Sequence, residues 1–438
     1  MIRFVRLAHC VAVLFALLAF DRAVAQDTTF RGVMISGTYD PLRDKIGISV
    51  MPITGAFGDS VRTIISRDLD FSDRFLVISV DSAEPAALRA QGSAAGLNYP
   101  LFARLNAAAV VQITMVATGL HVALHDVAHA KVINAGEFAL PSNALSRDWR
   151  LGVHRVSDEI ERWITGQRGI AATRIAYMRG QAIRVVDSDG ASEITVPTEP
   201  DGASPAWNAT GSMIAYTTYG ATSRILALDL ATGRSRTVVG PTRNTTYLTP
   251  VFAPSGNALV YAREGELGSD LFSIALSGGS PQQLTVGRGT LNTNPTLSPD
   301  GRRIVFVTGR LGPPELYIMD ADGTDQKVLT DYDFSEKNYR SDPDWSPDGR
   351  LVAYQERVNE RFQIRTIRVA GGTPKLLTSD GINEQPSWAP DGRHLVFTST
   401  RTGVRQLWVL DTESNRVRQL TKSAGSKLAS WSARLRNE

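Results

Sequence analysis

Three histidines, His121, His125 and His129, recur every four residues, and histidine is a common metal ligand in proteins. The string HDVAH, from His125 to His129, has the spacing of the zinc-protease motif H-E-x-x-H, in which the glutamate is the general base. Asp126 stands in place of that glutamate. The surrounding residues favour a β-strand, on which the outer two imidazoles lie about 26 Å apart. We therefore expect no shared metal and interpret all three as solvated strand histidines.

A second candidate is the acidic string DADGTD, from Asp320 to Asp325, which is similar to the start of a calcium-binding loop. The glutamate expected at the twelfth position of such a loop is Asp331 here, so we interpret the string as a hairpin turn. The sequence contains no G-x-S-x-G elbow, no Walker loop and no G-x-G-x-x-G after a strand. We predict no catalytic residue, no metal and no cofactor, and hence no enzyme.

The first 25 residues have the pattern of a secretory signal. Arg3 and Arg6 precede an apolar run from Val11 to Phe20, and the small-x-small sequence Ala23–Ala25 follows, which predicts cleavage before Gln26. Ten apolar residues extend only about 15 Å as a helix, too short for a bilayer core of about 30 Å. We therefore expect an exported chain that lies peripheral to the envelope membranes and does not span them.

Cysteine usage agrees with export. Cys10 is the only cysteine, and it precedes the apolar run, whereas a lipid-modified cysteine would follow it. The mature chain then has no thiol, which excludes disulfides, cysteine nucleophiles and thiolate metal sites and is consistent with an oxidising bacterial periplasm. Of 438 residues 42% are hydrophobic and 21% charged, in the ordinary globular range, and the formal net charge is +3. So small a charge predicts no nucleic-acid partner.

An internal repeat predicts the architecture. Five segments of the type W-S-P-D-G, and a sixth incomplete one, align on one anchor position at spacings of 45, 45, 48, 43 and 43 residues. The anchors are Trp207, Phe252, Leu297, Trp345, Trp388 and Trp431. Three further short runs rich in β-branched and aromatic residues follow each complete anchor, with turn sequences between them. Four strands per unit at this period predict a β-propeller, with the anchors packed between blades.

Six blades follow from the two ends of the repeat. A unit before Trp207 has second, third and fourth strands near Ile175, Ile183 and Glu193 but lacks an anchor strand, whereas the unit at Trp431 has only the anchor strand. We predict that these fragments complete one blade, so that the C-terminal strand closes the ring without an open sheet edge.

The residues before the repeat predict a small α/β domain. We expect strands at 45–53 and 75–80, a helix at 59–69 capped by Asp59, an antiparallel pair at 108–117 and 120–130, and a helix at 148–165. The predicted organisation is a signal peptide at 1–25, an N-terminal α/β domain with an N-terminal tail at 26–169, and a six-bladed β-propeller at 170–438.

The signal, the α/β module and the six W-S-P-D-G blades that end in Leu-Thr, in this order, resemble the TolB family, the periplasmic component of the Tol-Pal envelope system. Departures are Asn-Ala-Thr-Gly after Trp207 and the non-aromatic anchor Leu297. The resemblance implies a non-enzymatic adaptor that binds the lipoprotein Pal through one propeller face and the inner-membrane protein TolA through its N-terminal tail. It also implies a role in outer-membrane integrity and in constriction at cell division.

The loops that enter the anchor strands carry polar residues without a repeat consensus, and the resemblance implies that Pal docks there, with Tyr339 and Arg340 as the expected anchors. The predicted Pal-binding residues are Asn244, Thr246, Asn292, Asn294, Glu336, Tyr339, Arg340, Asp342, Asn383, Glu384 and Gln385. The predicted TolA-binding tail consists of Gln26, Asp27, Thr28, Thr29, Phe30, Arg31, Gly32, Val33 and Met34.

Two other functions remain open at this point. A periplasmic propeller enzyme, for example a lactonase, needs metal ligands that converge in the central channel. A cell-wall carbohydrate-binding module needs exposed aromatic platforms.

Overall fold

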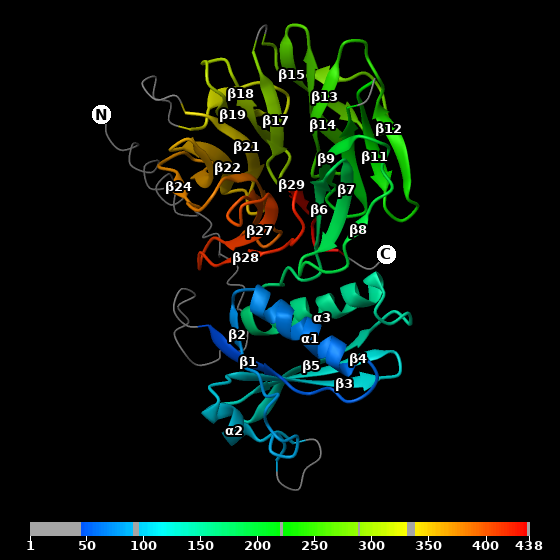
Figure 1. The fold of residues 1–438 in the computed structure, drawn as a ribbon, viewed down its shortest axis with the longest axis vertical. Helices are drawn as coiled ribbons and strands as arrows, with labels where there is room; N and C mark the ends of the chain where they lie inside the picture. The colour runs from blue at the N-terminus through cyan, green and yellow to red at the C-terminus, as the bar shows by residue number, and fades with distance from the viewer. Residues whose placement is uncertain (1–44, 91–95, 220–221, 288–289, 331–337, 436–438) are drawn as a thin grey trace, which may run out of the picture.

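The computed structural model describes residues 45–90, 96–219, 222–287, 290–330 and 338–435 (Figure 1). The predicted signal peptide, the cleavage point before Gln26, the tail at 26–34 and Glu336 lie outside these residues. Among the described residues, none of the helices combines the length and the apolar composition needed to cross a bilayer.

An α/β layer forms the N-terminal part. Its sheet has the order β2-β1-β3-β4-β5, with β1 parallel to β2 and β3, and the rest antiparallel. The strands are β1 (Ile46–Val50), β2 (Phe75–Val77), β3 (Ala109–Val116), β4 (Gly119–Asp126) and β5 (Lys131–Ala139). The helices are α1 (Gly58–Phe71), α2 (Tyr99–Arg104) and α3 (Arg147–Thr165).

Helices α1 and α3 pack on the side of the sheet that faces the propeller (Figure 1). Apolar residues at helical spacing, such as Trp149, Val153, Val156 and Ile160, join the strand residues in one core. The side chain of Ser146 caps α3 by accepting a hydrogen bond from the Trp149 N–H. These two helices therefore place their other faces against the propeller.

The expected elements of this region are confirmed, but two elements were missed and one helix cap is wrong. The sequence analysis did not predict the short helix α2, nor β5, whose apolar and polar residues do not alternate regularly and which lies at a half-exposed sheet edge. The predicted Asp59 cap is wrong: α1 is capped by Phe57, which has a positive φ and no side-chain hydrogen bond, and Asp59 lies in the first turn. A carboxylate there still interacts favourably with the helix dipole.

Six four-stranded antiparallel blades form the propeller, as predicted. From inner to outer strand, three of them are β29 (Ser426–Trp431), β6 (Arg174–Arg179), β7 (Ala182–Asp187) and β8 (Ile194–Thr195); β9 (Gly202–Trp207), β10 (Met213–Thr218), β11 (Arg224–Asp229) and β12 (Arg234–Val239); and β13 (Thr246–Phe252), β14 (Ala258–Gly265), β15 (Gly268–Ala275) and β16 (Gln282–Gln283). The others are β17 (Asn292–Leu297), β18 (Arg303–Thr308), β19 (Glu315–Asp320) and β20 (Lys327–Val328); β21 (Arg340–Trp345), β22 (Leu351–Val358), β23 (Arg361–Arg368) and β24 (Lys375–Leu376); and β25 (Asn383–Trp388), β26 (His394–Ser399), β27 (Gln406–Asp411) and β28 (Val417–Gln419).

The C-terminal strand closes the ring. Strand β29 pairs antiparallel with β6, with Trp431 opposite Ile175, so the two sequence fragments complete one blade as predicted. The indole N–H of Trp431 donates to the hydroxyl of Thr173 over 2.8 Å. The two ends of the propeller are thus held by a sheet ladder and by a buried side-chain hydrogen bond.

The aromatic anchors pack between blades, each at most 8% exposed. At four junctions the residue before one anchor accepts a hydrogen bond from the backbone N–H of the next anchor. These pairs are Thr296 with Trp345, Asp344 with Trp388, Ser387 with Trp431 and Ser430 with Trp207. The polar residue before the anchor is therefore a link between neighbouring blades.

Candidate functional site

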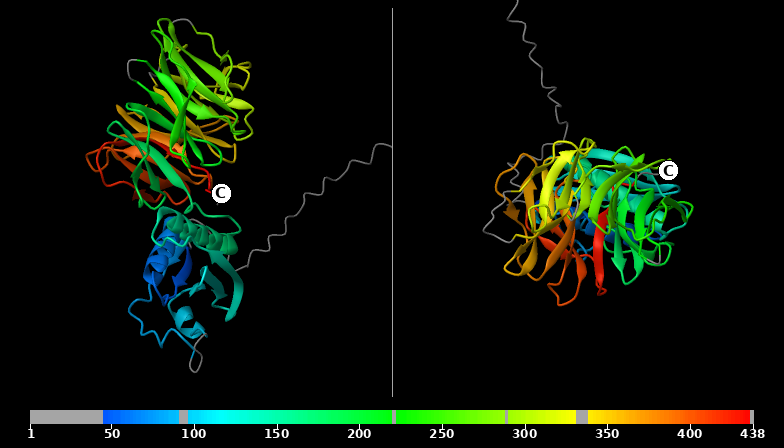
Figure 2. Two further views of the ribbon diagram at one scale, coloured as in Figure 1. Left: turned by 90° about the vertical axis from the view of Figure 1, so that its right-hand side faces the viewer. Right: turned by 90° about the horizontal axis from the view of Figure 1, so that it is seen from above.

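The start of each inner strand defines one face of the propeller, which we call the mouth face. Antiparallel pairing places Asn383 opposite Ser399, so the start of β25 lies at the same end of the blade as the β26–β27 connection. The anchors and the turns after them lie at the opposite end. The N-terminal domain lies at that opposite end, where its Asp73 contacts His394 and Arg416 of the propeller. The left view of Figure 2 shows the N-terminal domain below the propeller. Among the described residues, no contact of the N-terminal domain with the mouth face is found.

A β-bulge recurs at one position of all six inner strands. The bulged residues have φ between 45° and 57°, and they are Ser204, Thr249, Asn294, Asp342, Gln385 and Leu428. A bulge bends a strand and redirects a side chain, and here bulged residues bond across blades. The Asn294 amide donates to the Asp342 carboxylate over 2.8 Å, and the Leu428 N–H donates to the Gln385 side chain over 3.0 Å. The inner ring is thus a polar belt that includes three of the predicted Pal-binding residues.

The predicted Pal-binding residues differ in exposure. Asn244 is exposed, and six others are partly exposed: Thr246, Asn294, Tyr339, Asp342, Glu384 and Gln385. Asn292 and Asn383 are fully buried, and Arg340 is 7% exposed. The buried three hold the loops in place and offer little surface to a partner in this conformation.

Arg340 illustrates this structural role. Its guanidinium lies between two buried carboxylates, donating to Glu315 over 2.8 Å and to Glu356 over 2.9 Å. Although burial alone would lower the pKa of Arg340, these two carboxylates raise it. Tyr339, its neighbour, packs edge-on against Phe362 at 5.3 Å between ring centres and keeps part of its surface exposed.

Two carboxyl groups of the inner strand β21 have raised pKa values. Burial raises the pKa of Asp342 to about 6 and that of Asp344 to about 7. The Asp344 carboxylate also accepts the Trp388 N–H over 2.6 Å, which opposes the effect of burial. Near neutral pH Asp344 is therefore partly protonated, whereas Asp342 of the belt is mostly ionised.

A groove of about 520 Å³ opens at the mouth face beside Asn244. Leu267 and Val286 on its border are 69% and 82% exposed. The Arg263 guanidinium stacks over the Phe272 ring at 4.0 Å from its centre. Hydrophobic side chains beside stacked arginines are typical of protein interfaces. The sequence analysis missed this groove, because it is formed by a hairpin and two loops that the repeat does not align.

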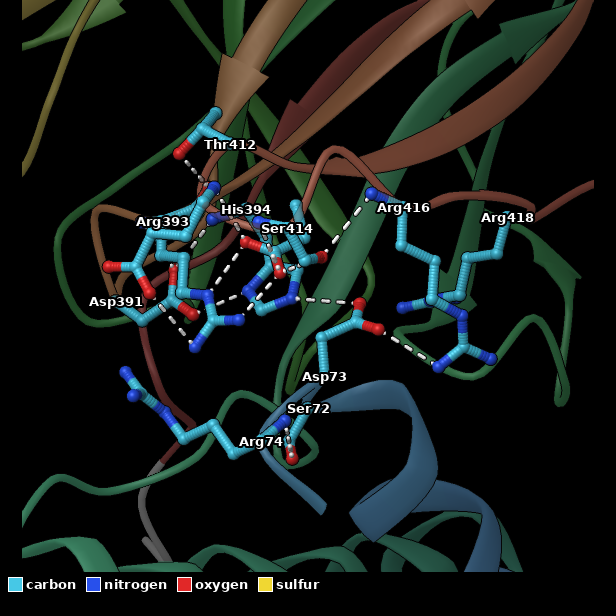
Figure 3. Close-up of polar contacts among 12 residues, drawn as sticks. Ser72, Asp73, Arg74, Asp391, Arg393, His394, Thr412, Ser414, Arg416 and Arg418 are labelled. Carbon is cyan, nitrogen blue, oxygen red and sulfur yellow. Dashed lines mark hydrogen bonds and ion pairs between the residues drawn. The ribbon is translucent and has the colours of Figure 1, made fainter. Parts of the chain in front are cut away.

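Charged residues also gather at the interface between the N-terminal domain and the propeller, which we call the seam. Arg416 of the propeller donates to Asp70 in the last turn of α1 over 2.8 Å. It also donates to Asp73, just after α1, over 2.9 Å (Figure 3). On the other side of the seam, Arg67 and Arg150 of the N-terminal domain bind Asp189 of the propeller. These ion pairs fix one domain against the other.

A small cavity of about 10 Å³ lies in the same seam. Arg418 lines it, with its guanidinium 4.2 Å from the centre of the Phe71 ring. Burial lowers the pKa of Arg418 to about 10. The two groups of side chains whose metal-ligand atoms converge, among the residues described, also lie in the seam: Asp68, His154 and Asp189, and Asp73, His394 and Asp411.

The sequence analysis missed the seam, because its partners are up to 346 residues apart and meet only when the domains dock. One signal was present. His394 occupies a repeat position at which the other complete blades carry Met213, Ala258, Arg303 and Leu351.

Two of the three histidines first considered as ligands have local partners, and His121 is partly exposed. His125 is 5% exposed and bonds to the Tyr99 hydroxyl and to Gln112, over 2.8 and 3.1 Å, so its interpretation as a solvated residue is wrong. His129 lies in the turn after β4 and bonds to Asp126 over 2.6 Å. In the string from Asp320 to Asp325, Asp322 accepts hydrogen bonds from Thr324, as expected of a turn.

Comparison with known proteins gives a consistent result. Residues 161–435 match the PD40 family, described as TolB beta propeller domain. The Tol-Pal system protein TolB of Bordetella pertussis is 27% identical over 184 residues, which cover 41% of this chain and 42% of that protein. The chain thus matches less than half the length of this curated relative.

Solved structures agree on the fold. TolB from Acinetobacter baumannii has a TM-score of 0.75 at 22% identity, over 89% of this chain and 97% of that one. The hydrazine synthase of Kuenenia stuttgartiensis has a TM-score of 0.51 at 13% identity, over 61% of this chain and 48% of that one. At such identities these matches establish the fold alone.

Proposed function

Because the chain belongs to the TolB β-propeller family, we propose that it is a periplasmic component of a Tol-Pal envelope system. The Tol-Pal name of its curated relatives and the fold shared with the Acinetobacter TolB support this proposal. The export signal in the sequence supports the location. The proposal includes the division of the chain into a signal peptide at 1–25, an α/β domain with its tail at 26–169 and a propeller at 170–438.

The chain acts as an adaptor that binds Pal through the mouth face. The observation that carries this proposal is that the N-terminal domain docks on the opposite end of the blades and leaves the mouth face uncovered among the described residues. That face presents the polar belt, the groove beside Asn244 and the partly exposed side chains of Tyr339 and Glu384. A central aromatic side chain within polar loops is typical of energetically important interface residues.

TolA binds the tail from Gln26 to Met34. This part of the proposal rests on the sequence and on the family, since the tail lies outside the described residues. Phe30, Val33 and Met34 are too apolar for an idle linker, and the tail is too short to form a core of its own. By joining TolA at one end and Pal at the other, the adaptor supports outer-membrane integrity and constriction at division.

We infer an adaptor in preference to a propeller enzyme or a carbohydrate-binding module. The convergent groups of histidine and aspartate lie in the seam, where arginines already bind several of their carboxylates. This placement favours a role in domain docking over a role as metal ligands for catalysis in the central channel.

The proposal is tested by a pull-down from a periplasmic extract with the exported protein as bait. Pal and TolA should be enriched and identified by mass. A matched bait with Tyr339→Ala and Glu384→Ala should lose Pal and keep TolA. Enrichment of neither protein by the wild-type bait contradicts the proposal.

A further inference from the structure

Two buried histidines, His154 and His394, face the seam with the same arrangement of partners. They are 0% and 1% exposed. In each, Nδ1 is bound by an aspartate of the histidine's own domain, and Nε2 points at carboxylates of the other domain. One of the two histidines comes from each domain, so the arrangement is reciprocal.

His394 belongs to the propeller. Its Nδ1 is 2.6 Å from the Asp391 carboxylate, and its Nε2 is 3.5 Å from the carboxylate of Asp73 in the N-terminal domain (Figure 3). Other charged groups around this pair are Arg393 on the same turn, Asp411 at the end of β27, Arg416 before β28, Glu161 on α3 and Lys45 before β1. Arg393 binds Asp411, and Arg416 binds the other oxygen of Asp73, so Asp391 has His394 as its cationic partner.

His154 on α3 belongs to the N-terminal domain. Its Nδ1 is 2.7 Å from the Asp68 carboxylate, and its Nε2 is 3.8 Å from Asp189 and 4.0 Å from Asp187 of the propeller. The charged groups that face these propeller carboxylates are Arg67 on α1, Arg147 and Arg150 on α3, Arg174 on β6 and Arg418 on β28.

The geometry requires a proton on each Nε2. A neutral imidazole that donates from Nδ1 to the aspartate of its own domain turns the Nε2 lone pair toward a second carboxylate, and in this buried setting the repulsion is only weakly screened. A protonated imidazole instead forms an ion pair across the seam. In this setting burial lowers the pKa of both histidines, but their aspartates outweigh it. The pKa of His394 rises to about 9, and that of His154 is raised as well.

We propose that His154 and His394 are reciprocal, proton-dependent latches that hold the N-terminal domain against the propeller, so that loss of both protons loosens the seam. This goes beyond the adaptor function and does not depend on which partners bind.

The direction of the pH dependence follows from the raised pKa values. Each latch is complete below the pKa of a free histidine, near 6.5, and is lost as pH rises through the raised value. Two acids of α3 act in the same direction. Burial raises the pKa of Asp158 to about 7 and that of Glu161 to about 8, so both gain charge in the seam as pH rises. The docked arrangement is therefore most stable near neutral and mildly acidic pH.

The test measures the distance between the domains as a function of pH. Cys10 is the single native cysteine, so the full chain with Cys10→Ser, Leu76→Cys and Val404→Cys carries one spin label on each domain. Leu76 and Val404 are exposed, which makes them suitable for labelling. Pulsed dipolar spectroscopy between pH 6 and pH 10, with EDTA present, should give one distance at low pH and a second, longer population with a midpoint near pH 9.

The variant His154→Gln/His394→Gln should show the longer population already at pH 7 and no midpoint near pH 9. Glutamine keeps a neutral donor in place of Nε2 but cannot take a proton. His125→Gln, the control, removes a buried histidine whose partners are uncharged, and it should behave as the wild type.

Three results overturn the proposal: a wild-type distance that does not change with pH, a double variant that remains docked, or EDTA alone separating the domains at pH 7. If the double variant fails to fold, NMR titration of the histidine rings in the wild type tests the proposal instead. The ring of His394 should remain protonated above pH 8, and the ring of His154 should titrate above the ordinary histidine value of about 6.5; the absence of either shift refutes the latches.

Discussion

Truncation of Trp431 tests the closure of the ring. The indole is 6% exposed and contacts a core formed by β6, β7 and the preceding blade. A buried tryptophan removes up to about 200 Å² from water, which at about 25 cal/mol per Å² is worth at most about 5 kcal/mol. Trp431→Ala also leaves the Thr173 hydroxyl without its donor, at a cost of about 1 kcal/mol. Because neighbouring side chains relax only partly into the cavity, we expect a loss of roughly 3–5 kcal/mol in the free energy of unfolding.

The assay is urea unfolding followed by tryptophan fluorescence and by circular dichroism. Trp408→Ala is the control, because this half-exposed tryptophan lies on β27, away from the β29–β6 junction, and should cost less. Deletion of 427–438 removes most of β29 together with the Arg434 contacts to the linker, and should destabilise all blades in one transition. An unchanged midpoint for Trp431→Ala or for the deletion would refute the closure argument.

The remaining predictions concern other parts of the molecule. Arg340→Ala should lower the free energy of unfolding by roughly 3–5 kcal/mol in thermal or urea melts, because Glu315 and Glu356 are left buried without their cation; a loss of Pal binding at unchanged stability would show that Arg340 acts as a contact residue instead. Glu161→Gln should become more stable relative to the wild type by roughly 1–3 kcal/mol as pH rises from 5 to 8, because over this range the wild-type carboxyl, with its pKa raised to about 8 in the folded protein, ionises mainly in the unfolded chain; the loss of the Arg74 ion pair, 3.0 Å long, offsets part of this gain, and equal pH profiles in paired melts would contradict the prediction. Removal of 26–34 should abolish TolA binding in a surface-capture assay and leave Pal binding within a factor of a few, and the tail is not the TolA element if binding survives.

The fold was predictable because each anchor residue marks where one repeat unit begins. The unit at Trp207 is complete, whereas the unit at Trp431 has only its anchor strand. Because the unit before Trp207 lacks an anchor strand, the repeat spacing alone predicts the pairing of β29 with β6. Turn sequences such as Pro-Asp-Gly mark the hairpins independently of the rest of the chain. Strand β5 lacked any such signal, because the apolar and polar residues at 131–139 do not alternate regularly.

The sites were less predictable for a physical reason. Loop position indicated which residues lie near the mouth face, but exposure depends on neighbours that sequence spacing does not place. Asn292 and Asn383 are buried by contacts with Asp270 and Gln363 of the preceding blade, and Arg340 by an ion pair with Glu315. The unusual histidine at the repeat position of His394 marked one residue of the seam, but its partner could not be predicted, since His394 meets Asp73 only after two separate domains have formed and docked.

Calorimetric titration of the exported protein with the soluble domain of Pal tests the central proposal most directly. The wild type should bind, and Tyr339→Ala/Glu384→Ala should weaken binding at least about tenfold, or about 1.4 kcal/mol. The control Arg302→Ala/Arg350→Ala changes two exposed side chains in turns at the opposite end of the blades and should bind as the wild type does. Absence of wild-type binding, or weakening by the control pair alone, would contradict the assignment of the mouth face to Pal.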